Sequence, residues 1–534
     1  MATIEHVTDP QPSEPQTSPS RGQLRGWRLA AAAAGVLLCL VWLAPIVIAH
    51  SPLRNWLLGM AAGDLAGSIR AGGASFGWFS PVKVYDLEVR DAQEDLVIQI
   101  PQIQADGALW KLVTNSTRIG RVRIARPLVN LALTDSGSNL EELLAPWLVE
   151  TGEPAADLSA QIEILDGRIS VKDQTSGRKW QVDKLRLALD LPQFGRQPIQ
   201  ARLSGVVPAE SRTGRLAVDL RLSHERPEAS LAETRGECSL TTESLPLDLL
   251  SAFARRVAPQ VRLSGFSTSS VACRWESLAA ANRNLELNGT LAADELRLAG
   301  LLPDDELRLQ RISVPCQLRW RDGQLVVERM EAECDLGRAM FAGTLDVTAG
   351  VTTSLRKQPY TLTGQIDLAR LAAALPNTIR VREATQINAG TLSFSLTSQR
   401  QSDGLRWQGQ VETSNLIATN RGQQITWEKP IVLTAAARDT QGGLVIEKLS
   451  CVSTFLLAEA AGSLERGDAT VAIDLNRLAA ELGRFVDLGG AQLAGDGQAK
   501  LHWTRGSGNF EAAGDMQIKN LGLAWPGSRP WTEA

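Results

Sequence analysis

Alternating apolar and polar residues dominate the chain after Gly67. Between Ile312 and Trp320 every second residue is apolar, and polar residues such as Gln317 and Arg319 lie between them. The same alternation runs through residues 362–366, 392–396 and 405–411. A period of two is typical of β-strands that have one apolar and one polar face. We therefore predict that this part of the chain is mainly β.

Two dipeptides in the β region are typical of tight turns. They are Asp166-Gly167 and Asp322-Gly323. Aspartate and glycine tolerate the positive φ that two-residue hairpin turns require. We expect an antiparallel hairpin at each of them, within an extended antiparallel sheet.

A long apolar segment precedes the strands. No charged residue falls between Arg28 and Arg54. About 20 apolar residues that rise about 1.5 Å each would span roughly 30 Å, the thickness of a bilayer's hydrocarbon core. A cleaved signal peptide is the alternative, with an apolar core of about 7–15 residues and a small-residue cleavage site. This segment is longer and lacks an A-x-A sequence at its end, so we favour a transmembrane anchor over residues 27–50.

The residues before the anchor orient it. Arg21, Arg25 and Arg28 stay in the cytoplasm by the positive-inside rule, so the bulk of the chain is expected to be periplasmic. The first 20 residues are rich in Pro, Ser, Gln and Thr. We predict a disordered cytoplasmic tail over residues 1–26 and a single-pass protein of the inner membrane.

A short amphipathic helix is predicted directly after the anchor, within residues 51–67. Ser51 can cap it, Pro52 suits its first turn and Gly63 can end it. Its apolar positions fall on one helical face. That face could lie on the bilayer, or it could cap the end of the β region by covering apolar sheet. Its residues are Leu53, Trp56, Leu57, Met60 and Ala61.

The β region repeats itself. Helix-like stretches occur near Asp248, Asp367 and Asp474, and glycines follow these aspartates by 41, 42 and 40 residues. A leucine stands seven residues after each glycine. The unit is about 105–120 residues of strand with one short helix. The last repeat breaks off near Ala534, and stacked repeats usually need a terminal cap, so we expect the chain to be part of a longer protein. The glycine and leucine pairs are Gly289 and Leu296, Gly409 and Leu416, and Gly514 and Leu521.

An extended sheet with one apolar face must cover that face. Its own side chains could fill the space, as in a sandwich. Alternatively, the sheet could curl into an open trough that holds acyl chains, where each buried CH₂ contributes about 0.8 kcal/mol. The membrane anchor favours the trough.

Residues 51–150 carry a resemblance to a known family. The motifs are Gly77-Trp78-Phe79-Ser80-Pro81, Ile100-Pro101, Ile124-Ala125-Arg126-Pro127 and Gly137-Ser138-Asn139-Leu140. Together with the anchor helix they resemble the start of AsmA-like proteins, the AsmA/TamB/YhdP group. The resemblance implies a chorein-like N-terminal β domain over residues 68–150, followed by a β-rich repeat region over residues 151–534.

The resemblance also implies a function. AsmA-like proteins are regarded as bridge-like lipid-transfer proteins that move phospholipid between the inner and outer membranes and support outer-membrane integrity. Some members are linked to the assembly of outer-membrane proteins. We therefore expect phospholipid acyl chains as ligands and an outer-membrane protein as a possible partner. The alternative is an envelope scaffold that binds clients by β-augmentation at its strand edges.

A row of apolar side chains in the alternating stretches is the candidate lipid site. A charge in such a lining is costly, so charged substitutions there are expected to block transfer. The candidates are Leu285, Leu287, Leu291, Val314, Leu318, Trp320, Leu362, Ile366, Leu392, Phe394, Leu396, Trp407 and Val411.

Patterns for other functions are weak. The net charge of −4 and the lack of a basic stripe argue against nucleic-acid binding. Gly73-Ala74-Ser75-Phe76-Gly77 matches G-x-S-x-G, but a predicted helix precedes it and Ser80-Pro81 follows it, which is the reverse of a nucleophile elbow. Only His224 and His502 could complete a triad far from the membrane. We expect no catalytic residues, no cofactor and no metal site, and hence no enzyme.

The six cysteines do not form a metal-binding motif, because no pair has C-x-x-C spacing. Cys39 lies in the apolar segment, which leaves five in the exported part. One disulfide between Cys238 and Cys273 is possible, and the alternative is that the cysteines act as small apolar side chains in strands.

Overall fold

The computed structural model describes most of residues 21–533. The gaps are 64, 116, 135–136, 149–158, 194–196, 210, 224–233, 258–259, 278–283, 301, 303–304, 347–350, 383, 403, 428, 441–442, 464, 482, 484, 486–491, 506–509 and 526–530. The first 20 residues of the predicted tail, the domain boundary predicted at residue 150, and His224 lie outside the described residues.

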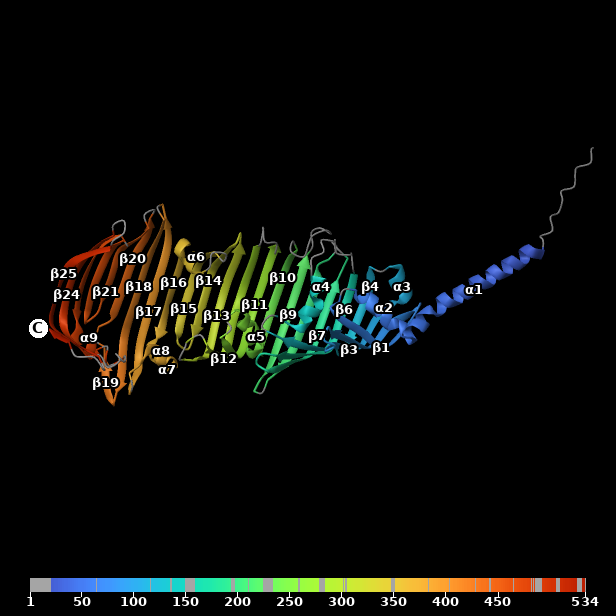
Figure 1. Ribbon diagram of the computed structural model, residues 1–534, viewed down its shortest axis with the longest axis horizontal. Coiled ribbons are helices and arrows are strands. Elements are labelled where there is room, and N and C mark those ends of the chain that lie inside the picture. Colours follow the sequence, from blue (N-terminus) through green and yellow to red (C-terminus); the bar gives the residue numbers. More distant parts are fainter. Residues whose placement is uncertain are drawn as a thin grey trace, which may run out of the picture.

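One continuous sheet forms the β region (Figure 1). Strands make up 69% of the structure, and the predicted mainly β class with an extended antiparallel sheet is confirmed. The strands are β1 (Gly67–Gly77), β2 (Ser80–Asp91), β3 (Leu96–Ala108), β4 (Arg118–Ala125), β5 (Leu128–Leu133), β6 (Ser159–Asp173), β7 (Lys179–Leu191), β8 (Ile199–Pro208), β9 (Thr213–Ser223), β10 (Arg235–Pro246), β11 (Arg262–Ser277), β12 (Asn284–Ala299), β13 (Leu307–Arg321), β14 (Gln324–Cys334), β15 (Gly337–Asp346), β16 (Tyr360–Asp367), β17 (Thr385–Gln401), β18 (Gly404–Asn420), β19 (Gln423–Thr426), β20 (Ile431–Thr440), β21 (Gly443–Val452), β22 (Leu456–Ser463), β23 (Arg466–Asp474), β24 (Gln492–Arg505), β25 (Phe510–Ala524) and β26 (Trp531–Glu533).

Helices lie at the ends and along the edges of this sheet (Figure 1). Figure 1 shows α5, α7, α8 and α9 along one long edge, where the strands end. The helices are α1 (Arg21–His50), α2 (Leu53–Ala62), α3 (Leu109–Thr114), α4 (Asn139–Leu148), α5 (Asp248–Val257), α6 (Val351–Lys357), α7 (Leu368–Ala374), α8 (Pro376–Ile379) and α9 (Leu475–Glu481).

Most neighbouring strands are antiparallel, but β6 pairs in parallel with both β4 and β5. The chain between β5 and β6 includes α4, and parallel strands need such a crossover connection. From β6 to β18 each strand pairs with the next in antiparallel order, and β18 then pairs with both β19 and β20.

The two turn predictions had different outcomes. Asp322 and Gly323 join β13 to β14, with φ of 51° and 77°, as a hairpin turn with two positive φ values requires. The prediction for Asp166-Gly167 is wrong, because both residues lie inside β6. Asp166 has φ of 56° at the point where β6 changes its partner from β4 to β5. An aspartate with positive φ serves a bend in a strand as well as a turn.

The predicted repeat is visible as a recurring irregularity in the strands. The residues before the three repeated leucines have φ of 53°, 55° and 54°, which non-glycine residues adopt rarely. Each is preceded in the chain by a short helix, α5, α7 or α9, and these helices lie along the same long edge of the sheet (Figure 1). In the second unit, a Cβ on Gly390 would stand 2.9 Å from Leu416 and 3.2 Å from Leu368 of α7, so glycine lets strand and helix pack closely. The three residues are Glu295, Asn415 and Asn520.

The short helices begin as the sequence indicates. Asp367 precedes α7 and its carboxylate accepts hydrogen bonds from the backbone N–H groups of Ala369 and Arg370, at 2.9 and 3.0 Å. Asp474 accepts one from Arg477 N at 2.8 Å. Aspartate at the N-cap satisfies donors that the first helical turn leaves unpaired.

The N-terminal helix is longer than predicted. It begins at Arg21, so residues 21–26 of the predicted tail are helical. Its segment Ala32–His50 is long and apolar enough to cross a membrane. Helix α2 follows and ends at Gly63, which has φ of 54°.

Helix α2 turns its predicted apolar face away from the sheet. Leu58 packs on the cluster of Ala71, Leu87 and Ile100, whereas four residues of the predicted face are exposed. The helix therefore caps the sheet through its other face. Arg54 and Asn55 fix this orientation through the hydrogen bonds that they form with β1. The exposed residues are Leu53, Trp56, Leu57 and Met60.

Near the start of the sheet, two helices cover its apolar face. Leu58 of α2 and Leu143 of α4 pack on β1 to β4. The four buried apolar clusters found among the described residues all lie between Leu58 and Leu245. The whole chain exposes 34715 Å², whereas a compact protein of its mass exposes about 19,000 Å². The chain is therefore extended and not compact, as Figure 1 also shows.

Candidate functional site: an open apolar groove

The apolar candidates on β12 and β13 share one face of the sheet. Residues directly opposite each other in an antiparallel pair point to the same side. The polar residues between them, such as Glu286 and Arg319, also oppose each other, and so point to the other side. The apolar pairs are Leu285 with Trp320, Leu287 with Leu318, and Leu291 with Val314.

The same face continues without interruption to β18. Leu318 opposes Val327 on β14, which opposes Gly343 on β15, which opposes Tyr360 on β16. On β16 to β18 the remaining candidates follow in the same register. The pairs are Leu362 with Leu396, Ile366 with Leu392, Phe394 with Val411, and Trp407 with Ser398. All thirteen candidates thus lie on one side of the sheet, which we call the apolar face.

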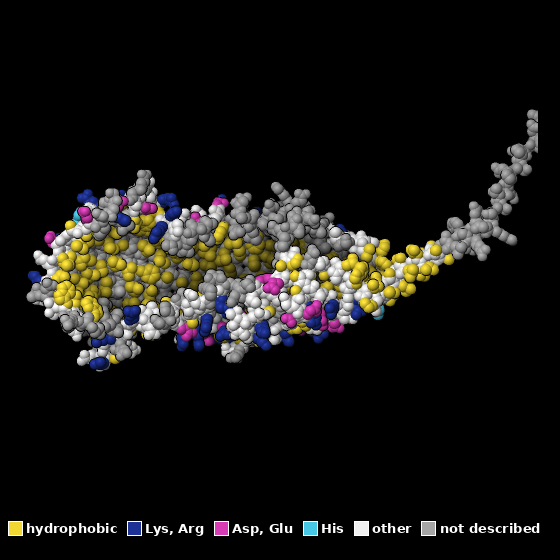
Figure 2. All heavy atoms as spheres, in the orientation of Figure 1, with side chains coloured by type: hydrophobic (Ala, Val, Ile, Leu, Met, Phe, Trp, Pro, Cys, Tyr) yellow, Lys and Arg dark blue, Asp and Glu magenta, His cyan; other side chains and the backbone are white. Residues whose placement is uncertain are grey.

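The apolar face extends beyond the candidates in both directions. Figure 2 shows hydrophobic side chains gathered in a hollowed band along the long axis, with charged side chains along its rims. Toward the C-terminus the band continues through Leu433, Leu449 and Ala460 to Leu501. Toward the N-terminus it continues through Cys273, Cys238 and Leu220.

Side chains on this face are open to solvent. Leu291 is 48% exposed, Leu501 44% and Met516 68%. Large apolar side chains of a closed sandwich would be mostly buried. The band is therefore a groove and not the interior of a sandwich.

Glycines opposite aromatic rings shape the groove floor, and the alternation of apolar and polar residues does not reveal them. A Cβ on Gly236 would stand 2.3 Å from Trp275, and one on Gly467 would stand 2.3 Å from Trp503. Each ring thus lies flat over the glycine of the neighbouring strand. It covers the glycine backbone and does not project into the groove. Isolated glycines inside strands were the available signal, because they often mark a close approach.

Hydroxyl groups on the apolar face are satisfied by one another. The Thr242 hydroxyl lies 3.2 Å from that of Ser267, which lies 2.9 Å from that of Ser269. Ser269 N donates to Thr242 Oγ1 at 2.9 Å. A hydroxyl that is paired in this way does not need a hydrogen bond from a ligand, so an apolar ligand can cover it at little cost in free energy.

The opposite face carries ion pairs between strands. Arg274 lies 3.0 Å from Glu237, and Arg319 lies 3.0 Å from Glu286. These side chains are about half exposed or more, so each pair contributes on the order of 0–1 kcal/mol. Their main effect is to make this face soluble, so the two faces of the sheet differ in chemistry.

Two cysteines lie opposite each other in the groove. Cys238 on β10 pairs with Cys273 on β11, and both are free thiols. Burial raises the pKa of both thiols, and Asp219 raises the pKa of Cys238 further. A raised pKa keeps them protonated and apolar near neutral pH, which suits a lining residue.

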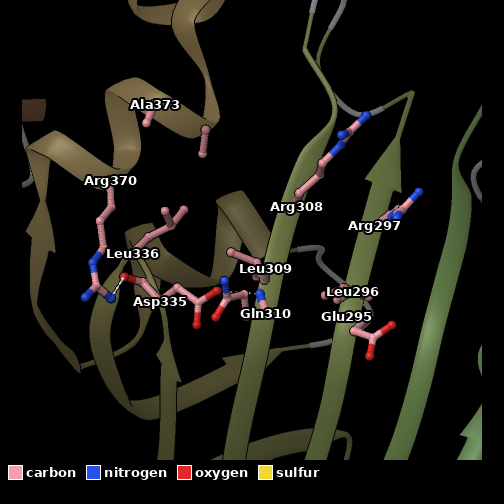
Figure 3. A pocket seen from close by; sticks show the side chains of 11 residues that line it. Glu295, Leu296, Arg297, Arg308, Leu309, Gln310, Asp335, Leu336, Arg370 and Ala373 are labelled. Carbon is pink, nitrogen blue, oxygen red and sulfur yellow. Dashed lines mark hydrogen bonds between the residues drawn. The ribbon is translucent and has the colours of Figure 1, made fainter. Parts of the chain in front are cut away.

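A cleft of about 670 Å³, lined by both charged and apolar residues, lies beside α7 (Figure 3). Asp335 accepts a hydrogen bond from Gln310 N, and its carbonyl accepts one from Arg370 at 2.8 Å. Glu295 is paired with Arg212. Figure 3 shows Arg297 and Arg308 pointing away from Asp335. The backbone carbonyl of Asp335 thus fastens α7, while the carboxylates of Asp335 and Glu295 bond to Gln310 and Arg212 and do not converge on a shared point.

The other chemical motifs do not assemble into a site. Ser75 of the G-x-S-x-G match lies inside β1 opposite Lys83, not at a strand-to-helix turn. His502 contacts Asp468 at 2.7 Å, on strands far along the sheet from Ser75. Within the described ranges, no group of three or more His, Cys, Asp or Glu residues is placed to hold a metal ion.

No family model, curated protein or solved structure matches this chain.

Proposed function

We propose that the groove binds the acyl chains of phospholipids and conducts lipid along the sheet, and that the protein has no catalytic activity. The observation that carries the proposal is the unbroken apolar face, which passes from strand to strand and is open to solvent. Each CH₂ that leaves water for such a surface contributes about 0.8 kcal/mol. A floor of similar side chains offers similar binding at every strand, so a bound chain could slide.

The anchor gives the conduit a starting point. In this proposal α1 crosses the inner membrane with its N-terminus in the cytoplasm, and the sheet extends through the periplasm toward the outer membrane. The packing of α1 supports a retained anchor over a cleaved leader, because Ala49 is 1% exposed and Arg54 bonds both to Ala49 O and to Ala71 O of β1.

Charged substitutions in the groove test the proposal. We expect Leu291→Asp with Leu433→Asp to reduce transfer of a fluorescent phospholipid between donor and acceptor vesicles by at least about tenfold, because a charge in an apolar lining costs several kcal/mol. Both side chains are exposed in the groove, so the fold should tolerate the change.

The matched control places charges on the opposite face of the same region. Asn288→Asp with Gln410→Glu should leave the transfer rate within about twofold of the original, since these exposed side chains point away from the groove. Equal transfer by the groove variant and the control would overturn the proposal.

A scaffold role is the second candidate, and one edge of the sheet favours it. Within the described part of the chain, β25 pairs with β26 only through Leu521, Gly522 and Leu523, so the rest of that edge has no strand partner there. Open strand edges bind extended peptides by β-augmentation. Crosslinking that captures a protein on β25, with no lipid in the groove, would favour this role over lipid transfer.

A further inference from the structure

The turn between β1 and β2 lies against the apolar segment of α1. Trp78 Nε1 donates a hydrogen bond to the carbonyl of Val41 at 3.0 Å. The rings of Phe79 and Trp42 lie 5.8 Å apart. Val41 precedes His50 by nine residues, which is about 13 Å along a helix. The tip of this hairpin therefore lies beside the apolar span and not beyond its end.

The joint between α1 and the sheet holds the hairpin in this position. Arg54 donates to Ala71 O at 2.9 Å and to Gly72 O at 2.6 Å, both on β1. Ala71 N in turn donates to Asn55 Oδ1 at 2.9 Å. Pro45 and Ala49, one helical turn apart, are buried on the α1 side of this joint. Helix and hairpin are thus fixed relative to each other.

Large apolar side chains are exposed around the hairpin tip. Phe79 is 71% exposed, and on α3 Trp110 and Val113 are 53% and 63% exposed. Helix α3 is tied to the hairpin, because Trp110 N donates to Trp78 O at 3.0 Å. The exposed face of α2 adds Trp56, which is 62% exposed. We call Trp56, Phe79, Trp110 and Val113 the collar.

We propose that the collar is immersed in the membrane leaflet nearest the β domain, so that the sheet begins inside the leaflet and not above it. This inference rests on the proposed function, in which α1 crosses the bilayer. The partner is the bilayer itself, because the collar is continuous with the apolar surface of α1 through the contact of Phe79 with Trp42. Exposed apolar area of this size is costly in water but stable among acyl chains.

The chemistry of the collar fits the boundary of a bilayer. Tryptophan, which supplies two of its residues, is enriched where hydrocarbon meets headgroups. Lys111 on α3 lies beside Trp110, and its long side chain can extend to lipid phosphates. The collar would place the turn between β1 and β2 in direct contact with the leaflet, with no water between them.

Photocrosslinking in the full chain tests the collar. A benzophenone amino acid replaces Phe79 or Trp110 in protein reconstituted in vesicles of phosphatidylethanolamine and phosphatidylglycerol, and lipid adducts are measured by mass spectrometry. Ile46 of α1 serves as the membrane reference, Leu291 reports the groove, and Arg274 on the opposite face is the control in water.

The expected yields separate the inference from the proposed function. Adducts at positions 79 and 110 should be within about twofold of position 46 and at least about tenfold above position 274. Adducts at 46 without adducts at 79 and 110 would overturn the collar, whatever position 291 shows. Adducts at 46, 79 and 110 but none at 291 would support the collar and count against the groove. A lack of adducts at 46 would overturn the anchor, and the collar with it.

A paired substitution gives a second readout. Phe79→Asp with Trp110→Asp should lower the lipid adducts at position 291 by at least about fivefold, because charge prevents the collar from entering hydrocarbon. Lys83→Asp, in the same hairpin but opposite Ser75, is the matched control. Unchanged adducts at position 291 in the collar variant would show that lipid reaches the groove without it.

Discussion

The carboxylate of Asp173 is fully buried in the turn between β6 and β7. Burial alone would raise its pKa, but hydrogen bonds from Ser176 and Arg255 more than offset this, so the pKa of Asp173 lies below its ordinary value. Arg255 comes from α5, and its guanidinium lies 2.6 Å from the carboxylate. One ion pair thus fastens the first repeated helix to a turn 82 residues away.

Removing the charge of Asp173 should loosen α5. We expect Asp173→Asn to lower the free energy of local opening at the β6–β7 turn and α5 by about 3–5 kcal/mol, because asparagine cannot form the buried ion pair with Arg255. Amide hydrogen exchange measures this. Asp183→Asn breaks the exposed pair with Arg168, and should cost no more than about 1 kcal/mol. Equal losses in the two variants would contradict the account.

The ion pair between Asp173 and Arg255 also predicts that the stability of this region depends on pH. Since the folded pKa of Asp173 is lowered, its contribution to stability is complete above the ordinary pKa of 3.8 and is lost as the pH falls through the folded pKa. The difference between the original protein and Asp173→Asn should therefore be constant near neutral pH and shrink in acid below pH 3.8.

At the scale of elements, a glycine and a tryptophan on neighbouring strands form one packing unit. We expect Gly236→Val to expel the Trp275 ring and to destabilise β10 and β11 by about 1–3 kcal/mol, as overpacking does. Hydrogen exchange of the two strands measures the loss.

The control for this prediction is the next residue on the same strand. Glu237→Val places the same side chain on the opposite, charged face, where it loses only an exposed ion pair with Arg274. Its effect should stay within about 1 kcal/mol. A similar loss of protection in both variants would show that valine on β10, and not the ring, is responsible.

The sequence predicted the elements that depend on local pattern. Alternation correctly predicted that Leu287, Phe394 and the other candidates share one face. Side chains along a strand point to alternate faces, so the face of each residue is fixed once the strands pair. The orientation of α2 did not follow, because its docking depends on hydrogen bonds from Arg54 to β1, which no helical periodicity contains. Asp166-Gly167 was misassigned because turns and strand bends use the same positive φ.

At the scale of the whole molecule, the strand periodicity alone left the choice between a filled sandwich and an open trough undecided, and only the anchor and the resemblance favoured the trough. Alternation of apolar and polar residues shows that one face of the sheet is apolar. It does not show what covers that face. The register of the strands also cannot be read from single strands, so the continuity from Cys238 to Leu501 required the structure. The resemblance to AsmA-like proteins stays a prediction.

An open sheet of this length makes a prediction about size. A compact protein of this length would have a radius of gyration of about 24 Å. We expect a clearly larger value, because the strands follow one another along a single axis (Figure 1). Small-angle neutron scattering in contrast-matched detergent measures it, and a value near that of a compact protein would refute the open trough.

Pairing between successive strands also decides how the molecule bears load. In an antiparallel sheet the hydrogen bonds run perpendicular to the strands, which here is along the long axis (Figure 1). Tension between the two ends would therefore act on the strand pairs in series and peel them apart one at a time, with no pair sharing the load of another. Further repeats would extend the reach of such a bridge without strengthening it. Its resistance to pulling is that of its weakest pair of strands.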